Sequence, residues 1–213
     1  MTDPMALVTD FALGVAAWIF AARLWHMRGG LKPALRLPHA APEPNVGRAS
    51  ARLWALAFLF TGLAAFAGGV FHGFGDEWRL LWKATTFSVG LASFFLLVGT
   101  DQRLQLVATL ELIAYLSWMI GHDAFLFVVL DYGLAMILVA IFHPAKKWVL
   151  GSMGASLAGA LVQAAHVTIH ERWFDYNDLY HVIQIVALWM LYRAAVAHAR
   201  RAEARPTFAT RRA

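Results

Sequence analysis

The sequence predicts an all-α integral membrane protein, a bundle of seven transmembrane helices with its N-terminus outside and its C-terminus in the cytoplasm. Seven stretches of the chain are each long and apolar enough to cross a bilayer. Apolar residues make up 60% of the 213 residues and charged residues only 15%, whereas a soluble domain carries roughly 45–50% and about 25%. Positive charges gather in alternate connections between the stretches. These observations place the chain in a cell membrane, and we expect the bacterial inner membrane.

Each crossing needs about 20 apolar residues in helical form. A helix is expected because lipid cannot satisfy the backbone groups of an open strand, and the sequence lacks the alternating pattern of a membrane barrel. We place the spans at residues 5–27, 50–72, 78–98, 104–121, 124–142, 148–170 and 178–197.

The elements follow in order along the chain. The first span comes after an acidic start, MTDPMALVTDF, unlike the basic start of a signal peptide, so it is expected to be retained. Residues 28–49 are rich in Pro and Gly and are expected to form a surface loop. The next four spans are near-continuous apolar runs. The sixth carries Gly151, Ala155 and Gly159 at four-residue spacing, which favours close packing on another helix. The seventh is expected to begin at Asn177 as its N-cap, with Asp178 at the positive end of the helix dipole.

Charge placement predicts the orientation. The basic residues of the first, third and fifth connections and of the tail are Arg28, Lys32, Arg36, Arg48, Arg103, Lys146, Lys147, Arg200, Arg201, Arg205, Arg211 and Arg212. The opposite side carries only Arg79 and Arg172 among several acidic residues. Because cytoplasmic loops are enriched in Lys and Arg, the N-terminus is expected outside, and an odd number of spans then puts the C-terminus in the cytoplasm.

A chain of this length holds one compact bundle. Residues 1–199 are therefore predicted to form a single transmembrane domain with a cytoplasmic loop at 28–49, followed by a basic cytoplasmic tail at 200–213. The absence of cysteine excludes disulfides and thiolate zinc sites. The net charge of +5 follows from the loop charges, so membrane lipid is the expected partner and nucleic acid is not.

Five histidines map to the predicted outer end of the bundle: His72, His122, His166, His170 and His181. The other four, His26, His39, His143 and His198, are expected at the cytoplasmic boundary. On one helix, the four-residue spacing of His166 and His170 would place both on the same face. That spacing suits two ligands of one zinc ion, and His72 or His181 with water would complete the site. The alternative is that each imidazole separately faces external water. Gln184 would share a helix face with His181 and could orient it.

Ionisable residues within the predicted spans are a second signal. Asp10, Lys83, Glu111 and Asp131 lie there, where such residues are rare and usually paired or functional. A Lys83 ion pair with Glu111 or Asp131 is one interpretation, and a catalytic or proton-relay role is the other. Asp10 is close enough to the end of its span to reach the outer interface.

The segments GGVFHG, which ends just after His72, and NDLYHVIQ, which contains His181, resemble motifs of the CREST superfamily. This superfamily comprises seven-helix membrane hydrolases that include alkaline ceramidases and the progestin/adiponectin receptors. In it a helix-two S-x-x-x-H, a helix-three Asp and a helix-seven H-x-x-x-H hold one zinc ion. The resemblance implies a divergent bacterial member with the seven-helix, N-outside architecture. Three positions differ from the pattern, where this chain has Gly68, Lys83 and Asn177.

The resemblance implies a metal-dependent hydrolase that acts on a lipid amide or ester near the outer leaflet. His72 and His181, which match the family motif, would hold the zinc ion with help from His166 or His170. The ion would lower the pKa of its bound water to about 7. Asp178 or Asp175 would act as the base, and Lys83 would stabilise the developing oxyanion.

Two other classes of function stay open. Lys83, Glu111 and Asp131 at membrane depth, with titratable histidines above them, indicate a proton-linked transporter or sensor. Many transporters show inverted repeats or broken helix pairs, and neither is visible in this sequence. A structural membrane protein, in which polar groups only hold helices together, would explain the small-residue face of the sixth span.

Overall fold

The apolar stretches of the sequence form long helices. The computed structural model describes residues 4–27, 46–74, 79–170 and 173–204. The helices are α1 (Pro4–Trp25), α2 (Val46–Phe74), α3 (Arg79–Thr100), α4 (Gln105–Gly121), α5 (Phe125–Phe142), α6 (Lys146–Ala164) and α7 (Tyr176–Ala204), with a 3-10 helix, η2 (Gln102–Leu104), before α4. The described residues contain no strand beyond one isolated bridge between His170 and Phe174. The all-α prediction is confirmed.

Among the described residues, six helices are long and apolar enough to cross a bilayer, namely α1 to α5 and α7. The chain is therefore a multi-pass helical membrane protein. α6 falls outside this group because it opens with Lys146 and Lys147 and carries Gly, Ser and Ala where the other helices carry Leu and Phe. A seventh crossing stays a prediction.

The predicted sixth span, 148–170, is longer than the helix found there. α6 ends at Ala164, and His166 adopts a left-handed backbone with φ of 51°. The His166 N–H donates to the Gln163 carbonyl at 3.2 Å, and the Val167 N–H donates to the Val162 carbonyl at 3.0 Å. This pair of bonds is a Schellman motif, which ends a helix and is usually built on glycine. The sequence offered no glycine at this place, so the end of the helix was missed.

The predicted loop and tail lie mostly outside the described residues. Residues 46–49 of the loop and 200–204 of the tail are described, and both segments are helical. α2 and α7 therefore each extend beyond the predicted spans 50–72 and 178–197.

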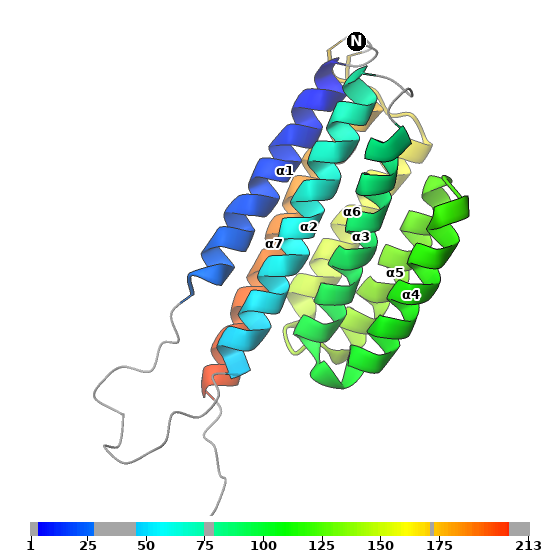
Figure 1. The fold of residues 1–213 in the computed structure, drawn as a ribbon. Helices are drawn as coiled ribbons and strands as arrows, with labels where there is room; N and C mark the ends of the chain where they lie inside the picture. Colours follow the sequence, from blue (N-terminus) through cyan, green and yellow to red (C-terminus); the bar gives the residue numbers. More distant parts are fainter. Residues whose placement is uncertain (1–3, 28–45, 75–78, 171–172, 205–213) are drawn as a thin grey trace, which may run out of the picture.

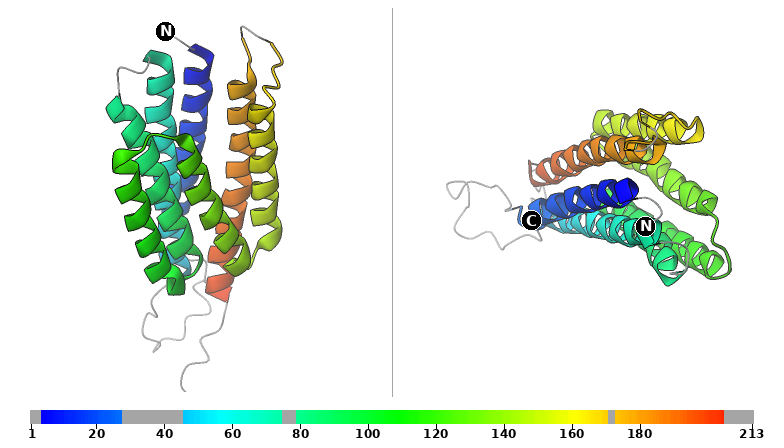
Figure 2. Two further views of the ribbon diagram at one scale, coloured as in Figure 1. Left: turned by 90° about the vertical axis from the view of Figure 1, so that its right-hand side faces the viewer. Right: turned by 90° about the horizontal axis from the view of Figure 1, so that it is seen from above.

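Consecutive helices run in alternating directions and form two layers (Figures 1 and 2). α1, α2, α3 and α4 follow one another in the first layer, and α7, α6 and α5 form the second. Contacts of α7 with α1 and α2, and of α5 with α3, join the layers. The first and last helices are thus neighbours, and the described ends of the chain lie at opposite ends of the bundle (Figure 1). The side of the membrane on which each end lies stays a prediction.

The distribution of apolar side chains fits a lipid environment. The interior is filled by Trp54, Phe58 and Leu97, which are fully buried. Large apolar side chains also cover the outside, for example Ile120 and Leu126, of which more than half is exposed. Exposed apolar surface on several helices is stable in hydrocarbon and unfavourable in water.

The small-residue face of α6 packs against α7, as predicted. A Cβ on Gly159 would lie 3.0 Å from Gln184 Nε2 and 3.2 Å from Tyr180 Cδ2, and one on Gly151 would lie 3.1 Å from the Met190 sulfur. Glycine at these two positions lets the helix backbones approach closely.

Candidate functional site

Four buried polar residues meet between α1 and α7, near the end of the bundle where both helices begin. We call them the α1–α7 polar cluster. Thr9 and Asp10 come from α1, and Asp178 and His181 come from α7; their exposed fractions are 7%, 5%, 1% and 9%. Buried polar groups are costly unless they are hydrogen-bonded to one another, so the contacts within this cluster decide what it can do.

His181 lies at the centre of the cluster with an α1 oxygen at each ring nitrogen. Its Nε2 is 3.2 Å from Asp10 Oδ1, and its Nδ1 is 3.0 Å from the Thr9 hydroxyl. Adjacent residues of α1 therefore hold the two sides of one imidazole. The ring bridges the first and last helices of the bundle.

The Thr9 hydroxyl connects His181 with Asp178 through hydrogen bonds. Its hydroxyl lies 3.0 Å from Asp178 Oδ1 and 3.2 Å from the carbonyls of Met5 and Ala6 in its own helix. Asp178 is the favoured acceptor because a bond to an ionised carboxylate is stronger than one to a carbonyl. The chain of contacts thus runs from Asp10 through His181 and Thr9 to Asp178.

Asp178 also fixes the start of α7. Its Oδ2 accepts from the Asp175 N–H at 3.0 Å, while Asp175 Oδ1 accepts from the Asn177 and Asp178 N–H groups at 2.8 and 3.2 Å. This reciprocal arrangement is a capping box with Asp175 as the N-cap. The prediction that Asn177 caps the helix is therefore wrong, and Asn177 Oδ1 instead accepts from Gln163 Nε2 at 3.2 Å.

The protonated form of His181 is compatible with the three contacts described between α1 and α7. An imidazolium donates from Nε2 to Asp10 and from Nδ1 to Thr9, whose own proton then goes to Asp178. A neutral ring with its proton on Nε2 takes the Thr9 proton and leaves Asp178 without that donor. A neutral ring with its proton on Nδ1 turns a lone pair toward Asp10. The direction of the hydrogen bonds therefore depends on how many protons the ring carries and on which nitrogen.

Other residues pack around the cluster without joining its series of hydrogen bonds. A Cβ on Gly69 of α2 would lie 2.8 Å from the Asp10 Cβ, so glycine there lets α2 approach. The ring of Tyr180 has its centroid 5.3 Å from that of His181. Gln184, which was expected to orient His181, accepts from Ser156 Oγ at 3.1 Å instead.

Two members of the cluster were not predicted as site residues. Asp10 was expected at the outer interface, and that prediction is wrong because α7 covers its carboxylate. Thr9 was not considered at all. The polar pair Thr9–Asp10 inside an apolar run was the available signal, but the sequence does not say which helix packs against it.

The predicted metal ligands do not come together as expected. His72 is exposed on α2, with its ring centroid 6.4 Å from that of Trp82. His166 and His170 follow the end of α6, so the premise that they share a helix face is wrong. Within the described part of the chain, no group of three or more His, Asp or Glu residues is placed to hold a metal ion. We therefore assign no step to a metal, and the zinc hydrolase stays a prediction.

Comparison with known proteins places the bundle in a family. Residues 5–200, which include nearly all of the described helices, match a family of unknown function, DUF6962. The chain belongs to the DUF6962 family. No curated protein and no solved structure matches it.

Lys83 of this DUF6962 protein caps α4. Its Nζ lies 2.7 Å from Asp123 Oδ1 and donates to the carbonyls of Met119, Ile120 and His122. A cation at the C-terminal end of a helix is favourable because the last carbonyls carry partial negative charge. The predicted ion pair of Lys83 with Glu111 or Asp131 is therefore not the one formed.

Asp123 lies between α4 and α5 and takes part in two ion pairs. The Lys83 ammonium first, and the Arg79 guanidinium second, hold the pKa of Asp123 below its ordinary value. The Arg79 contact is 2.5 Å long, but most of the Arg79 side chain is exposed. Lys83, which is largely covered, is the stronger partner.

A pair of acidic residues lies deeper in the bundle. Glu111 of α4 and Asp131 of α5 are in electrostatic contact, and the Ser93 hydroxyl of α3 donates to Asp131 Oδ2 at 2.8 Å. Two neighbouring carboxylates repel one another when both are ionised. The pair is thus a second place where titratable groups lie within the spans.

The opposite end of the bundle holds a buried histidine. His143, between α5 and α6, is fully buried. Its Nδ1 accepts from the Ala145 N–H at 3.0 Å, and its ring packs edge-on to Trp54 with centroids 5.4 Å apart. Burial first, and then the nearby His198 and Arg201, lower the pKa of His143 to about 3. His143 is therefore neutral near pH 7.

Proposed function

We propose that this DUF6962 protein is a proton-linked transporter or pH sensor, and that the α1–α7 polar cluster is where it takes up a proton. The observation that carries the proposal is the position of His181, buried between the first and last helices with each ring nitrogen against an α1 oxygen. Histidine is the side chain that most readily changes charge near neutral pH. Ionisable residues inside membrane-spanning helices are typical of proton relays.

The two protonation states of His181 differ in how firmly they join α1 to α7. With the proton bound, three hydrogen bonds connect the helices, and a cation lies between the carboxylates of Asp10 and Asp178. Without it, one of these bonds is lost or a lone pair faces Asp10. Release of the proton therefore weakens the contact between the two helices. A helix pair with two packing states is what a transporter gate or a sensor needs.

Charged and titratable groups from two neighbouring helices lie around His181. α1 contributes the carboxylate of Asp10, and α7 contributes Asp178 and the phenol of Tyr180. Asp175 reaches the ring only through the capping box with Asp178. α2 meets the cluster at Gly69, which carries no charge. One imidazole thus lies near two carboxylates, those of Asp10 and Asp178.

The Glu111–Asp131 pair supports a proton-linked function independently. It comes from different helices, α4 and α5, and Ser93 orients one of its carboxyl groups. Two separate titratable groups inside one bundle are more than a structural role requires, because apolar residues of similar size hold helices together as well or better.

The test measures the separation of α1 and α7 as the pH changes. Because the chain has no cysteine, spin labels can be attached at Val15→Cys and Val186→Cys, two exposed positions away from the cluster. In the full chain in lipid nanodiscs, we expect the distance distribution between the labels to differ between pH 8 and pH 5.5. In His181→Asn it should be the same at both values.

His122→Asn is the matched control, because His122 is an exposed histidine at the end of α4, stacked on Trp118. It should keep the pH response. An unchanged distribution in the unmodified chain, or a response that survives in His181→Asn, would overturn the proposal. One zinc ion per purified chain, lost in both His72→Ala and His181→Ala, would favour the zinc hydrolase instead.

A further inference from the structure

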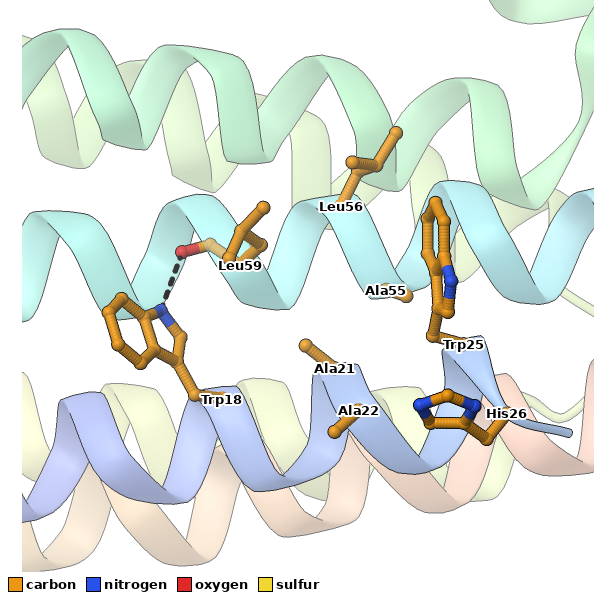
Figure 3. Close-up of a pocket in the computed structure, with 8 residues that line it drawn as sticks. All are labelled: Trp18, Ala21, Ala22, Trp25, His26, Ala55, Leu56 and Leu59. Carbon is orange, nitrogen blue, oxygen red and sulfur yellow. Dashed lines mark hydrogen bonds between the residues drawn. The ribbon is translucent and has the colours of Figure 1, made fainter.

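An apolar groove runs between α1 and α2 on the outer face of the bundle (Figure 3). It has a volume of about 420 Å³ and is lined by Trp18, Ala21, Ala22, Trp25, His26, Ala55, Leu56 and Leu59. This volume lies in the range of small-molecule pockets, about 300–1,000 Å³. The groove opens outward, toward the surface that faces lipid in a membrane-spanning bundle.

The groove is built by helical spacing in both helices. On α1, Trp18, Ala22 and Trp25 fall on one face at intervals of three and four residues, and on α2 Ala55 and Leu59 do the same. The alanines leave room between the two indoles (Figure 3). The Trp18 indole N–H donates to the Leu59 carbonyl at 3.2 Å, which holds that side of the groove in place.

Positive charge lies at one end of the groove. The guanidinium carbon of Arg52 is 5.5 Å from the centroid of the Trp25 ring. Arg48 comes one helical turn before Arg52 on the same face of α2 and is exposed. His26 lines this end as well. The groove therefore combines an apolar channel with a cationic end, at the level where α1 ends and α2 begins.

We propose that this groove binds an anionic phospholipid, with one acyl chain between Trp18 and Trp25 and the phosphate beside Arg52 and His26. Charge complementarity selects this occupant, because the site is apolar along its length and cationic at one end. Inside a bilayer an acyl chain gains little by moving from lipid to an apolar groove. The headgroup charge therefore decides which lipid is bound, as in other basic pockets between membrane helices.

Native mass spectrometry of the full chain tests the site. The purified protein is titrated with phosphatidylglycerol, which is anionic, and with phosphatidylcholine of the same acyl chains, which is zwitterionic. We expect tighter binding of phosphatidylglycerol. Arg52→Gln should weaken that binding about fivefold, the effect of one basic residue near a lipid headgroup, and Arg52→Lys should largely restore it.

The matched control is Arg193→Gln. Arg193 of α7 also lies over indole rings, 4.7 Å from the centroid of Trp148 and 5.5 Å from that of Trp189. Unlike Trp25, which lies under Arg52, these two rings do not line the groove. Replacement of Arg193 should leave phosphatidylglycerol binding unchanged. Equal effects of Arg52→Gln and Arg193→Gln would mean non-specific attraction to positive charge and would overturn the proposal.

A second variant tests the acyl-chain part of the groove. Ala22 is exposed within it, so Ala22→Phe fills the space without entering the core, and Ala22→Leu is a smaller alternative should the first not fold. Both should weaken the binding of both lipids. Undiminished binding to a folded Ala22 variant would overturn the proposal, as would glycerol 3-phosphate binding as tightly as the intact lipid. If the unmodified chain forms dimers and the Ala22 variants do not, the groove binds a second copy of the chain, and the proposal is overturned.

Discussion

At the scale of single residues, Thr9 is the position where the structure adds most to the sequence. Its hydroxyl lies between His181 and Asp178 and contacts both at 3.0 Å. Valine has nearly the same shape but cannot donate or accept a hydrogen bond. The role of Thr9 can therefore be tested with little change in packing.

We expect Thr9→Val to lower the free energy of unfolding by about 1–3 kcal/mol, because it leaves polar atoms of His181 and Asp178 buried without this partner. Thermal unfolding in detergent measures the loss. Thr109→Val is the control, since the Thr109 hydroxyl bonds only the Gln105 carbonyl of its own helix among the contacts found. Equal stability of the two variants would contradict the assigned role.

His143 makes a prediction about acid stability. Its pKa is lowered to about 3 by burial, whereas an unfolded histidine titrates near about 6.5. Between these values the unfolded chain binds a proton that the folded chain does not, so the free energy of unfolding falls as the pH drops from about 6.5 to about 3. His143→Gln removes this contribution.

Melting temperatures measured from pH 7 to pH 4 should therefore fall less steeply for His143→Gln than for the unmodified chain. The exposed His122 supplies the comparison, because His122→Gln should leave the slope unchanged. Parallel slopes for all three proteins would show that the His143 ring accepts a proton as easily when folded as when unfolded.

At the scale of elements, the α6–α7 pair shows how a less apolar helix is held in the bundle. Gly159 lies against Tyr180 and Gln184, and Ser156 is hydrogen-bonded to Gln184. Close backbone approach and a side-chain hydrogen bond replace the large apolar contacts used elsewhere.

Gly159→Leu should therefore weaken this helix pair by about 1–3 kcal/mol, the usual cost of overpacking a well-filled contact. The change can be followed by thermal unfolding or by protease sensitivity of the segment before α7. Gly154→Leu on the same helix is the control, because a Cβ there meets nothing within 4 Å. A harmless Gly159→Leu would mean that the two helices separate easily.

At the scale of the whole molecule, the position of α6 in the bundle predicts the number of crossings. In the part of the chain that the structure describes, six helices qualify as spans by length and composition, and α6 runs beside α7 in the second layer (Figure 2). Because α6 packs along a neighbour that qualifies as a span, we expect it to cross the membrane too.

Thiol labelling can test this in a chain without cysteine. Lys147→Cys and Val167→Cys place single thiols just inside and just beyond the two ends of α6, both exposed. A membrane-impermeant reagent added to intact spheroplasts should modify only the second. Modification of both, or of neither, would show that α6 does not cross and would overturn the N-outside, C-inside orientation with it.

Features that depend on one segment of the chain were predictable from the sequence, and features that depend on contacts between segments were not. The helices were predictable because each apolar run must satisfy its own backbone hydrogen bonds in lipid, whatever its neighbours do. The end of α6 at Ala164 was not predictable, because His166 occupies a left-handed position that sequences normally mark with glycine. Asp178 was predicted as a base and His181 as a zinc ligand, whereas in the structure His181 contacts Asp10 and Thr9, and Asp178 contacts Thr9.

By itself the sequence determined that this DUF6962 protein is an all-α membrane protein and that its ionisable residues inside the spans need partners. The tertiary structure alone decided which partners they have. His181 contacts Asp10, Lys83 forms an ion pair with Asp123, and Glu111 lies near Asp131. The physical reason is that insertion into lipid depends on the composition of each segment, whereas the pairing of buried polar groups depends on which helices lie side by side.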